Sequence, residues 1–386
     1  MKILYYTQTS FLDCDLPLIK TFRKMGHEVF LVFELLPYQL KSNIIDIKKQ
    51  IPKVGLLPLT SYKEFHLFSN FIAVDKAFIL NRPCKVYSWE NVKLRREFHH
   101  LVEIINPDVI HCTNFIDIPD LFLYFYKKKI IQVVHDPFPH SGENTLRKKI
   151  RRKIGFMFIK RFVLLNENQK EEFIRRTKIN GKYVFTNRLG TYDYLNYFKP
   201  TGQEESKENI ILFWGRISPY KGIEYLLEAM EIVHKQISNA KLVIAGAGHI
   251  YFDYSPYTNK NYIELINRYI TLNELGKLLS SATVVVCPYT DATQSGVVMS
   301  SFTYQVPVVA TDVGGLSEMI EDHVTGLLVP PKDSQELAKS LTYLLKSNET
   351  IDKYRKNIYK YCHEGKYSWQ SIASEYIQIY RTIRKK

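Results

Sequence analysis

Short apolar runs alternate with amphipathic segments along the chain, and this order limits the possible folds more than any other feature. The first cycle joins an apolar run at residues 3–6 to an amphipathic segment at residues 16–24, which is followed by Gly26. Such runs predict buried strands, and amphipathic segments that end near a glycine predict helices. Because strands that alternate with helices form parallel sheets covered on both faces, the sequence predicts an α/β fold.

The pattern occurs twice, which predicts two domains. In the first half the predicted strands lie at residues 3–6, 29–33, 109–112 and 130–134, with a further helix at residues 121–127. In the second half the predicted strands lie at residues 210–214, 241–245, 282–287 and 308–310, and the predicted helices at residues 223–235, 272–280 and 297–304. The sequence therefore predicts one domain over residues 1–198 and a second over residues 210–365.

Two segments are set apart from these domains by their composition. Residues 199–209 are polar and contain Pro200 and Gly202, which predicts a linker. Residues 366–386 place Trp369, Tyr376 and Tyr380 among other apolar side chains at helical spacing. This spacing predicts a C-terminal helix that packs back on one of the domains.

The chain has a formal net charge of +14, and the excess of cations lies in its first half. Residues 1–200 hold 33 Lys and Arg against 19 Asp and Glu, whereas the remaining residues hold 20 of each. The densest part runs from Lys127 to Arg176, and within it residues 145–160 alternate cations with apolar side chains. Such a segment attracts anionic surfaces and predicts a contact with an anionic membrane, with a solvated cationic helix face as the alternative.

The compartment is predicted from what the chain does not contain. No run approaches 18 apolar residues, so no membrane-spanning helix is expected, and the first apolar run is too short for a signal peptide. The five cysteines lie far apart, which predicts neither disulfides nor a zinc site. We expect a cytoplasmic protein, with residues 145–160 as a candidate for peripheral attachment to the inner face of the membrane.

The strongest motif for chemistry is a small polar turn that runs into a helix. Thr293, Gln294, Ser295 and Gly296 follow the predicted strand 282–287 and open the next helix. Amides at a helix N-terminus, together with the helix dipole, attract phosphate, and the two hydroxyls add donors. The motif predicts a phosphate-binding turn, with an ordinary helix cap as the alternative.

A second turn carries two cations after the predicted strand 210–214. Gly215 and Arg216 precede Lys221 and Gly222, so the guanidinium and the ammonium stand five residues apart. Arginine presents a fork that suits phosphate, and lysine presents a point charge. Such cations compensate the charge of a departing diphosphate, although two cations in a surface loop are also common.

Two glycine-rich turns follow other predicted strands. Gly246 and Gly248 form part of a dinucleotide motif whose third glycine is replaced by Tyr251. A pair of glycines at 314–315 precedes Glu318, whose carboxylate can accept hydrogen bonds from sugar or ribose hydroxyls or can point to water.

In this order, the turns resemble family 4 of the retaining, nucleotide-sugar-dependent glycosyltransferases. The resemblance is dense from about residue 208 to 335 and implies the GT-B fold, in which two Rossmann-like, doubly wound domains face each other across a cleft. It also implies that the N-terminal domain binds the acceptor and the C-terminal domain binds the nucleotide sugar. The segments that carry it are Gly215–Arg216, Lys221–Gly222, Gly246–Gly248, Gln294–Gly296, Pro307–Thr311, Gly314–Glu318 and Thr325–Pro330.

The resemblance assigns roles residue by residue. Arg216 and Lys221 would hold the donor diphosphate, and His135, at the end of the predicted strand 130–134, would lie beside the donor sugar. These three are the expected catalytic residues. The expected donor-binding residues are Gly215, Ile270, Gln294, Ser295, Gly296, Val297 and Glu318. For His111, at the end of the preceding predicted strand, we favour a structural role.

The chain departs from the family pattern at two places. Many members carry two glutamates eight positions apart around the phosphate-binding helix, and Ala292 and Ser300 occupy these positions. Many members also have a Gly-Gly turn after the first strand, where this chain has residues 9–13 without glycine. The first departure leaves donor identity open and admits a catalytically degenerate sugar-nucleotide-binding subunit.

The function implied by the resemblance is transfer of a hexosyl group from a nucleoside diphosphate sugar to a hydroxyl of a glycan or lipid-linked acceptor, as in cell-surface polysaccharide assembly. The only Asp-x-Asp triplet, residues 13–15, lies outside the second-half motifs, so we expect no metal or other cofactor. The charge alone also admits a nucleic-acid-binding protein, but no such module is present and we expect no nucleic-acid partner. An NAD-dependent oxidoreductase is disfavoured by the incomplete glycine motif.

Overall fold

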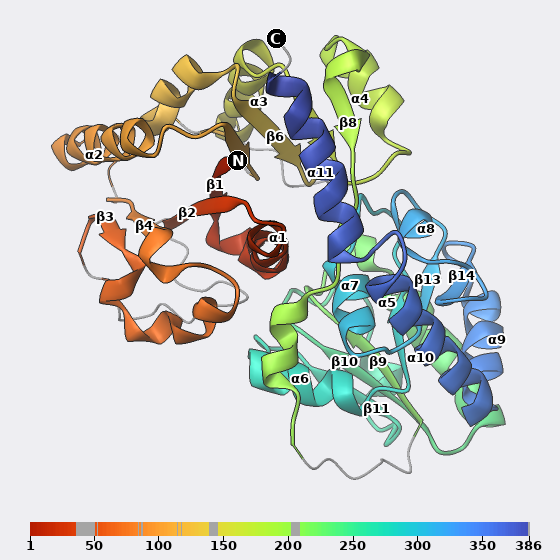
Figure 1. Cartoon of the computed structure of the whole chain (residues 1–386). Helices are drawn as coiled ribbons and strands as arrows, with labels where there is room; N and C mark the ends of the chain where they lie inside the picture. Colours follow the sequence, from red (N-terminus) through yellow and green to blue (C-terminus); the bar gives the residue numbers. More distant parts are fainter. Residues whose placement is uncertain are drawn as a thin grey trace. The chain divides into compact units, whose positions relative to one another are not determined.

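The computed structural model describes residues 1–35, 51, 53–83, 85, 88–113, 115–116, 118–138, 146–201 and 209–384. The chain divides into two compact units, each an α/β structure (Figure 1). The first unit comprises Met1–Leu189 and Trp369–Lys386, and the second comprises Gly190–Ser368. The predicted linker, 199–209, falls within the range of the second unit, and its residues 202–208 lie outside the described residues.

The described part of the first unit contains an eight-stranded sheet in the order β3-β4-β2-β1-β5-β6-β7-β8, in which β3 is antiparallel to β4 and the other pairs are parallel. The strands are β1 (Lys2–Gln8), β2 (Glu28–Leu35), β3 (Gly55–Pro58), β4 (Ala77–Asn81), β5 (Val109–Cys112), β6 (Ile130–Val134), β7 (Phe162–Leu164) and β8 (Val184–Thr186). The predicted strands of the first half are confirmed as β1, β2, β5 and β6. Their nearly continuous apolar sequences fit strands that are covered on both faces.

Helices and short 3-10 turns connect these strands. The helices are α1 (Leu12–Lys24), α2 (Trp89–Ile105), α3 (Leu146–Phe158), α4 (Lys170–Thr177) and α11 (Trp369–Arg384). The 3-10 segments are η1 (Thr9–Phe11), η2 (Leu59–Ser61), η3 (Lys63–Asn70), η4 (Val74–Lys76), η5 (Ile118–Tyr126) and η6 (Gly181–Tyr183).

The helix predicted at residues 121–127 forms as part of the 3-10 segment η5 rather than as an α-helix. Its backbone is not helical at Asp120, where φ is −109°. The buried Asp120 carboxylate accepts a hydrogen bond from the Tyr6 hydroxyl at 2.6 Å and pairs with Arg82. These tertiary contacts fix Asp120 in the sheet core and override the local apolar pattern.

The second unit has a six-stranded parallel sheet within its described residues, in the order β11-β10-β9-β12-β13-β14. The strands are β9 (Asn209–Trp214), β10 (Ala240–Ala245), β11 (Ile263–Ile266), β12 (Val284–Cys287), β13 (Val308–Thr311) and β14 (Gly326–Val329). The helices are α5 (Ile223–Gln236), α6 (Leu272–Ser281), α7 (Gly296–Thr303), α8 (Leu316–Met319), α9 (Ser334–Leu345) and α10 (Asn348–His363), with 3-10 turns η7 (Asp193–Phe198), η8 (Pro219–Lys221) and η9 (Ser255–Tyr257). The chain thus winds outward twice from β9, which confirms the predicted doubly wound fold.

The C-terminal helix α11 packs back on the first unit, as predicted, and lies beside α1 (Figure 1). Phe22 of α1 meets Tyr380 of α11 with ring centroids 5.7 Å apart. The Tyr380 hydroxyl also lies 2.5 Å from Nδ1 of His111, at the end of β5. Because these side chains are buried, α11 forms part of the first unit's core rather than a separate tail.

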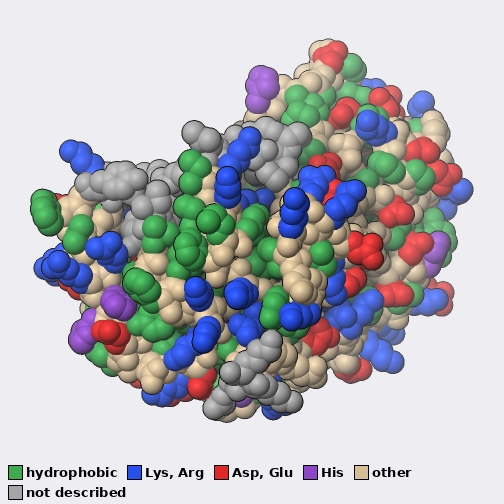
Figure 2. Space-filling model, turned by 90° about the horizontal axis from the view of Figure 1, so that it is seen from above, with side chains coloured by type: hydrophobic (Ala, Val, Ile, Leu, Met, Phe, Trp, Pro, Cys, Tyr) green, Lys and Arg blue, Asp and Glu red, His purple; other side chains and the backbone are tan. Residues whose placement is uncertain are grey.

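The surface of the chain carries the charge asymmetry of the sequence. Figure 2 shows many Lys and Arg side chains, with hydrophobic side chains exposed between them on part of the same face. In the described residues, the basic segment predicted at 145–160 forms α3, with Ile150 and Met157 exposed; Thr145 lies outside the described residues. No helix of the described chain is long and apolar enough to cross a membrane.

Candidate functional site

The second unit brings two of the predicted turns together at the point where its strand order reverses. Strands β9 and β12 pair side by side, although β10 and β11 separate them in the sequence. Ligands of open parallel sheets bind at the carboxyl ends of the strands that flank such a point. The turn after β9 and the turn after β12 meet there, since the Thr290 amide donates to the Tyr220 carbonyl at 2.8 Å.

Lys221 is the central side chain of this meeting point. It is 9% exposed, and its Nζ lies 3.6 Å from the centroid of the Tyr289 ring. Burial lowers the pKa of Lys221 to about 8; the nearby Cys287 thiol opposes this shift and the charge of Arg216 adds to it. In the described chain no carboxylate pairs with Lys221, so the aromatic ring is its main compensation. A buried cation of this kind is suited to an anionic ligand.

The predicted phosphate-binding turn lies directly beside Lys221. The Tyr289 hydroxyl is 3.4 Å from Oγ of Ser295, which is the N-cap residue of α7. The Ser295 amide donates to Sδ of Met319 at 3.3 Å, and sulfur is a weak acceptor that a phosphate oxygen can replace. Tyr289 therefore contacts the buried ammonium through its ring and the N-cap residue of α7 through its hydroxyl.

The missing side chain of Gly296 makes room for a neighbouring tyrosine. A Cβ at Gly296 would lie 2.7 Å from the Tyr192 hydroxyl. The missing side chain thus makes room for Tyr192, whose amide donates to Oγ1 of Thr303 in the same helix at 2.9 Å. Gly296 fixes the start of α7 against Tyr192, and its two neighbours, Ser295 and Val297, are buried.

The turn after β10, which carries the incomplete dinucleotide motif, packs closely against the turn that carries Arg216. Gly246 has a φ of +153°, and a Cβ there would lie 1.8 Å from the Gly215 carbonyl oxygen. The Gly215 amide donates to the Ala245 carbonyl at 2.9 Å, so the turns after β9 and β10 run in contact. Only glycine permits this approach, and it holds the segment that carries Arg216, which is exposed.

The remaining predicted donor residues also follow carboxyl ends of strands. Ile270 is half-buried after β11 and precedes Thr271, which caps α6. Glu318 is half-buried in α8 after β13, and its carbonyl accepts from the Tyr367 hydroxyl. Gln294 is half-buried in the turn before α7. These residues share the edge of the sheet on which Lys221 lies.

The two positions without glutamate are closed to ligands. Ala292 is 3% exposed, and its carbonyl accepts from the Gly315 amide at 3.2 Å. Ser300 is fully buried, and its hydroxyl donates to the Gly296 carbonyl at 2.8 Å. Ala292 has no polar side-chain group and the Ser300 hydroxyl is used within α7, so neither offers a polar group to a sugar.

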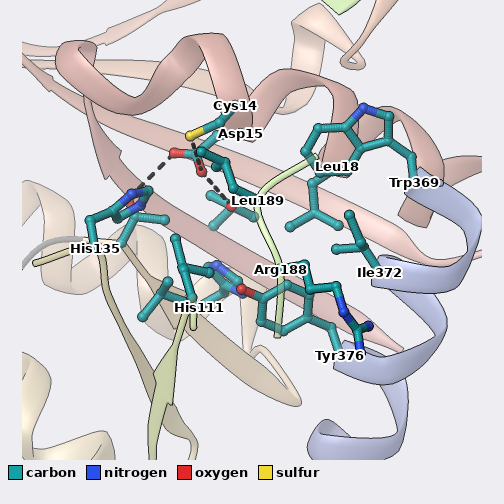
Figure 3. A pocket seen from close by; sticks show the side chains of 14 residues that line it. Cys14, Asp15, Leu18, His111, His135, Arg188, Leu189, Trp369, Ile372 and Tyr376 are labelled. Carbon is teal, nitrogen blue, oxygen red and sulfur yellow. Dashed lines mark hydrogen bonds between the residues drawn. The ribbon is translucent and has the colours of Figure 1, made fainter. Parts of the chain in front are cut away.

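In the first unit, His135 directly follows β6, as predicted. Its ring stacks on Phe11 with centroids 4.2 Å apart, and burial lowers its pKa to about 4, against the opposing charge of Asp136. His135 lines a small cavity of about 20 Å³ together with Asp15, His111 and Tyr376 (Figure 3). The imidazole is therefore neutral near pH 7 and can accept or donate a hydrogen bond.

The structural role expected of His111 is confirmed. Its side chain is fully buried, stacks on Tyr5 at 4.2 Å and meets the Tyr380 hydroxyl. Burial lowers the pKa of His111 to about 3. The ring thus ties β1, β5 and α11 together as a neutral group.

A buried carboxyl at the same end of the sheet was missed by the sequence analysis. Asp15 accepts hydrogen bonds from Thr7 at 2.5 Å, from Tyr5 at 2.7 Å and from Thr113 at 3.4 Å. Thr7 lies at the end of β1 and Thr113 just beyond β5, the strands that flank the point where this sheet reverses. Their two hydroxyls after neighbouring apolar runs were the available signal, but the predicted first helix began one residue beyond Asp15.

The hydrogen bonds of Asp15 also explain why residues 9–13 form a turn without glycine. The described residues with positive φ do not include any of residues 9–13, so the turn has no need of glycine. Instead η1 leads directly into α1, and Asp15 anchors the first turn of that helix to β1 and β5.

A second buried cluster lies at the C-terminal ends of β2 and β4. Arg82 Nε pairs with Glu34 Oε1 at 2.8 Å and the same guanidinium pairs with Asp120. All three side chains are buried, and removing one partner of such a cluster is costly because the other charges stay in the protein interior. The cluster ties η5 to the two strands.

Comparison with known proteins shows that the second unit is similar in sequence to glycosyltransferases. Residues 197–361 match the family model described as Glycosyl transferases group 1. An uncharacterized glycosyltransferase of Methanocaldococcus jannaschii, MJ1607, is 32% identical over 210 residues, which are 52% of this chain and 51% of that protein. Alpha-D-kanosaminyltransferase of Streptomyces kanamyceticus is 29% identical over 235 residues, 57% of this chain and 60% of that protein. The chain thus spans about half the length of these relatives.

Solved structures show the fold over the whole chain. Anabaena Alr3699/HepE, crystallised with UDP and glucose, has a TM-score of 0.67 at 15% identity and covers 99% of this chain and 100% of its own. Sucrose-phosphate synthase from Thermosynechococcus elongatus has a TM-score of 0.67 at 17% identity, with coverage of 100% and 99%. These similarities confirm the predicted GT-B fold class.

The protonation of Asp15 gives a test of the first unit. Burial raises the pKa of Asp15 to about 7, against the lowering effect of its hydrogen bonds. Between the unfolded value near 4 and about 7, the folded protein holds a proton that the unfolded chain has lost. Stability from this group is therefore present at low pH and lost as pH rises to about 7, at about 1.4 kcal/mol for each pKa unit.

Asp15→Asn, which cannot ionise, should gain stability relative to the unmodified protein as pH rises from 4 to 7. Urea unfolding of the first unit at several pH values measures the difference, with Asp75→Asn, at an exposed position of the same unit, as the control for the substitution itself. A difference for Asp15→Asn that is constant with pH would show that the carboxyl ionises normally.

Proposed function

We propose that the protein is a retaining glycosyltransferase that moves a hexosyl group from a nucleoside diphosphate sugar to a hydroxyl of a glycan or lipid-linked acceptor, in cell-surface polysaccharide assembly. The observation that carries the proposal is the buried ammonium of Lys221, on the face of Tyr289 and beside the start of α7. A diphosphate would compensate this charge, and the N-terminus of α7 would bind its second phosphate.

The proposed roles of the donor-site residues combine the family resemblance with their positions at the carboxyl ends of the strands. Arg216 and Lys221 stabilise the negative charge that develops on the diphosphate as the glycosidic bond breaks. The amides of Ser295, Gly296 and Val297 hold the distal phosphate. Gly215 and Gln294 line the phosphates, and Ile270 and Glu318 hold the base and the ribose or sugar.

The reaction proposed here is attack from the face of the leaving group. The acceptor oxygen bonds to the anomeric carbon, the bond to the diphosphate oxygen breaks, and the departing phosphate takes the acceptor proton. The configuration is retained without a carboxylate pair of the hydrolase type. His135, the neutral imidazole after β6, is the proposed hydrogen-bonding partner of the donor sugar.

The comparisons support this reading of the second unit. The match to Glycosyl transferases group 1 spans every proposed donor residue, from Gly215 to Glu318. The named relatives with sequence similarity are glycosyltransferases, and the structural neighbour from Anabaena binds UDP. UDP is accordingly the first nucleotide to test.

Removal of the Lys221 charge should weaken nucleotide binding. In a thermal-shift panel of nucleoside diphosphates, the true ligand raises the melting temperature most, because it stabilises only the folded protein. For that ligand, Lys221→Ala should raise Kd about 10- to 100-fold, since hydrogen bonds to charged groups contribute about 1.5–3 kcal/mol.

Lys235→Ala, at an exposed position of α5, is the matched control and should bind as the unmodified protein does. A change in Kd of less than twofold for Lys221→Ala would exclude Lys221 from the phosphate site.

We also propose that transfer needs no metal, because Arg216 and Lys221 supply the positive charge that a divalent ion provides in other transferases. Purified, metal-free protein should therefore keep its transfer rate in excess EDTA, with a Mg²⁺-dependent transferase as the control that loses activity. If EDTA abolishes turnover and Mg²⁺ or Mn²⁺ restores it, the proposed metal independence is wrong.

One observation favours a second candidate function, a catalytically degenerate subunit that binds sugar nucleotides. The buried Ala292 and Ser300 give this site no carboxylate at the two usual positions. The two functions separate in one assay, since the subunit would bind the nucleotide sugar without transferring or hydrolysing it.

For its location we propose the inner face of the cytoplasmic membrane, with α3 in contact with anionic lipid. Within α3, Lys149 and Lys153 are exposed, as are the apolar side chains Ile150 and Met157. This mixture favours the boundary between headgroups and acyl chains.

A further inference from the structure

A groove in the first unit, distant in sequence from the donor motifs, has no role in the proposed chemistry. It lies between α2 and η5 and encloses about 430 Å³. Arg95, Arg96 and His99 of α2 form one side, and Leu121, Phe122 and Phe125 of η5 form the other. The two sides therefore differ in character, one cationic and one apolar.

The apolar side chains around the groove project into solvent instead of packing. Phe125 is 84% exposed and Leu121 is 38% exposed, whereas Phe122 is buried and packs on Phe98 with centroids 5.4 Å apart. Trp89, the first residue of α2, is 86% exposed. Large aromatic side chains that stay this exposed mark a surface that contacts another phase or molecule.

The cations around the groove are available for a ligand. Arg95 and Arg96 are exposed, and neither forms an ion pair within the described chain. The nearby acids of α2 are otherwise engaged, because Glu97 lies 3.9 Å from Lys93, and Glu103 lies 3.9 Å from His99 and 3.8 Å from His100. Lys127 and Lys128, just after η5, are also exposed.

The direction of the α2 side chains places charge and aromatic ring on the same outer face. Trp89, Lys93 and Arg96 follow each other at helical spacing and lie opposite the buried stripe of Leu94, Phe98 and Val102. Next to η5, the ring of Tyr124 stacks on Phe158 of α3, with centroids 5.0 Å apart. This stack joins η5 to the C-terminal end of α3, where Met157 is 68% exposed.

We propose that the α2–η5 groove docks this protein on the surface of an anionic phospholipid bilayer. Arg95 and Arg96 bind lipid phosphates, and Trp89 and Phe125 enter the boundary between headgroups and acyl chains. Arginine suits phosphate because of its planar fork, and exposed aromatic rings favour the membrane interface. The inference rests on the proposed membrane location and extends it from α3 to a defined lipid-binding groove.

An anionic bilayer fits these features better than the alternatives do. A peptide ligand would need a closed pocket for its anchor side chains, whereas Trp89 and Phe125 stand out from the surface. A bilayer accepts protruding aromatic rings and supplies the negative charge that unpaired arginines attract. A single-stranded nucleic acid also combines stacking with phosphate, and it enters the test as a competing outcome.

Flotation of the full chain with vesicles tests the proposal. One vesicle preparation is phosphatidylcholine alone and the other contains phosphatidylglycerol as the anionic component. The unmodified protein should float with the anionic vesicles at low salt and much less with the neutral ones. Arg95→Glu with Arg96→Glu should reduce its partitioning at least about tenfold, because each cation near the surface contributes roughly a factor of five. Trp89→Ser with Phe125→Ser should reduce it severalfold while the salt dependence remains.

Matched controls carry comparable charge reversals and ring removals on the second unit. Lys353→Glu with Lys356→Glu reverses two exposed cations of α10, and Tyr343→Ser with Tyr359→Ser removes two exposed rings. Both controls should float as the unmodified protein does. Because the changed positions of the groove and of the controls are exposed, all variants should keep their thermal unfolding midpoints.

Three results would overturn the proposal. The first is absence of flotation with anionic vesicles, and the second is flotation of the Arg95 and Arg96 variant at the level of the unmodified protein. The third comes from a parallel gel-shift assay with single-stranded RNA, in which that variant loses RNA binding while its vesicle binding is unchanged. UDP titration of the same preparations keeps the two proposals apart. If the protein floats as expected but does not bind UDP or any other nucleoside diphosphate, the proposed function fails and the lipid groove stands. If the protein binds a nucleoside diphosphate but does not float, the lipid groove fails and the proposed function stands.

Discussion

The pairing of β9 with β12 creates the environment on which the rest of the second unit's site depends. It brings the turn after β9 against the turn after β12, and the Lys221 ammonium then rests on the Tyr289 ring. Burial of this charge without a carboxylate costs stability, and the aromatic face offsets only part of that cost. Under the proposed function, the negative charge of a bound phosphate would supply the remaining compensation.

The neighbouring residues maintain that arrangement through backbone contacts. Gly246 lets the turn after β10 run against Gly215, and Tyr192 fixes the first turn of α7 by filling the space at Gly296. The side chains at 292 and 300 are used for packing, so the site depends on cations, amides and a helix dipole. Such a site recognises phosphate more strongly than it distinguishes one sugar from another.

In the first unit, the point where the strand order reverses holds a buried carboxyl group instead of a cation. There the neighbouring strands β1 and β5 end in Thr7 and Thr113, which hold the buried Asp15. His111 and the C-terminal helix complete this layer beneath the turn that carries His135. A polar network of this kind is rigid because every member is hydrogen-bonded inside the core. It occupies the place where many members of the family that the chain resembles have a glycine turn.

The sequence predicted the elements whose apolar pattern is local. Strands such as β6 and helices such as α5 appear at or within one residue of their expected bounds, because buried parallel strands and amphipathic helices have strong periodic signals. The segment 121–127 was predicted as a helix, but its 3-10 form was not, and Asp120 just before it is held by Tyr6 and Arg82, which are distant in sequence. Short strands such as β3 and β14 were not predicted, because their sequences show no distinct apolar pattern.

The features of the candidate site were likewise predictable only in part. Strand-end turns were visible because glycines, cations and hydroxyls follow apolar runs. The compensation of Lys221 by Tyr289 and the protonation of Asp15 depend on burial, which one sequence does not reveal. The purpose of Gly296 was also hidden, because Tyr192 lies more than a hundred residues away.

Hydrogen exchange of backbone amides with and without UDP tests the central claim most directly. Bound diphosphate should slow exchange in the peptides that contain Ser295–Val298 and Gly215–Gly222, while peptides from α9 and α10 exchange at unchanged rates. If another nucleoside diphosphate gives the largest thermal shift, it replaces UDP in the experiment. A nucleotide that binds without protecting either turn would contradict the assignment of Lys221 and the start of α7 as the phosphate site.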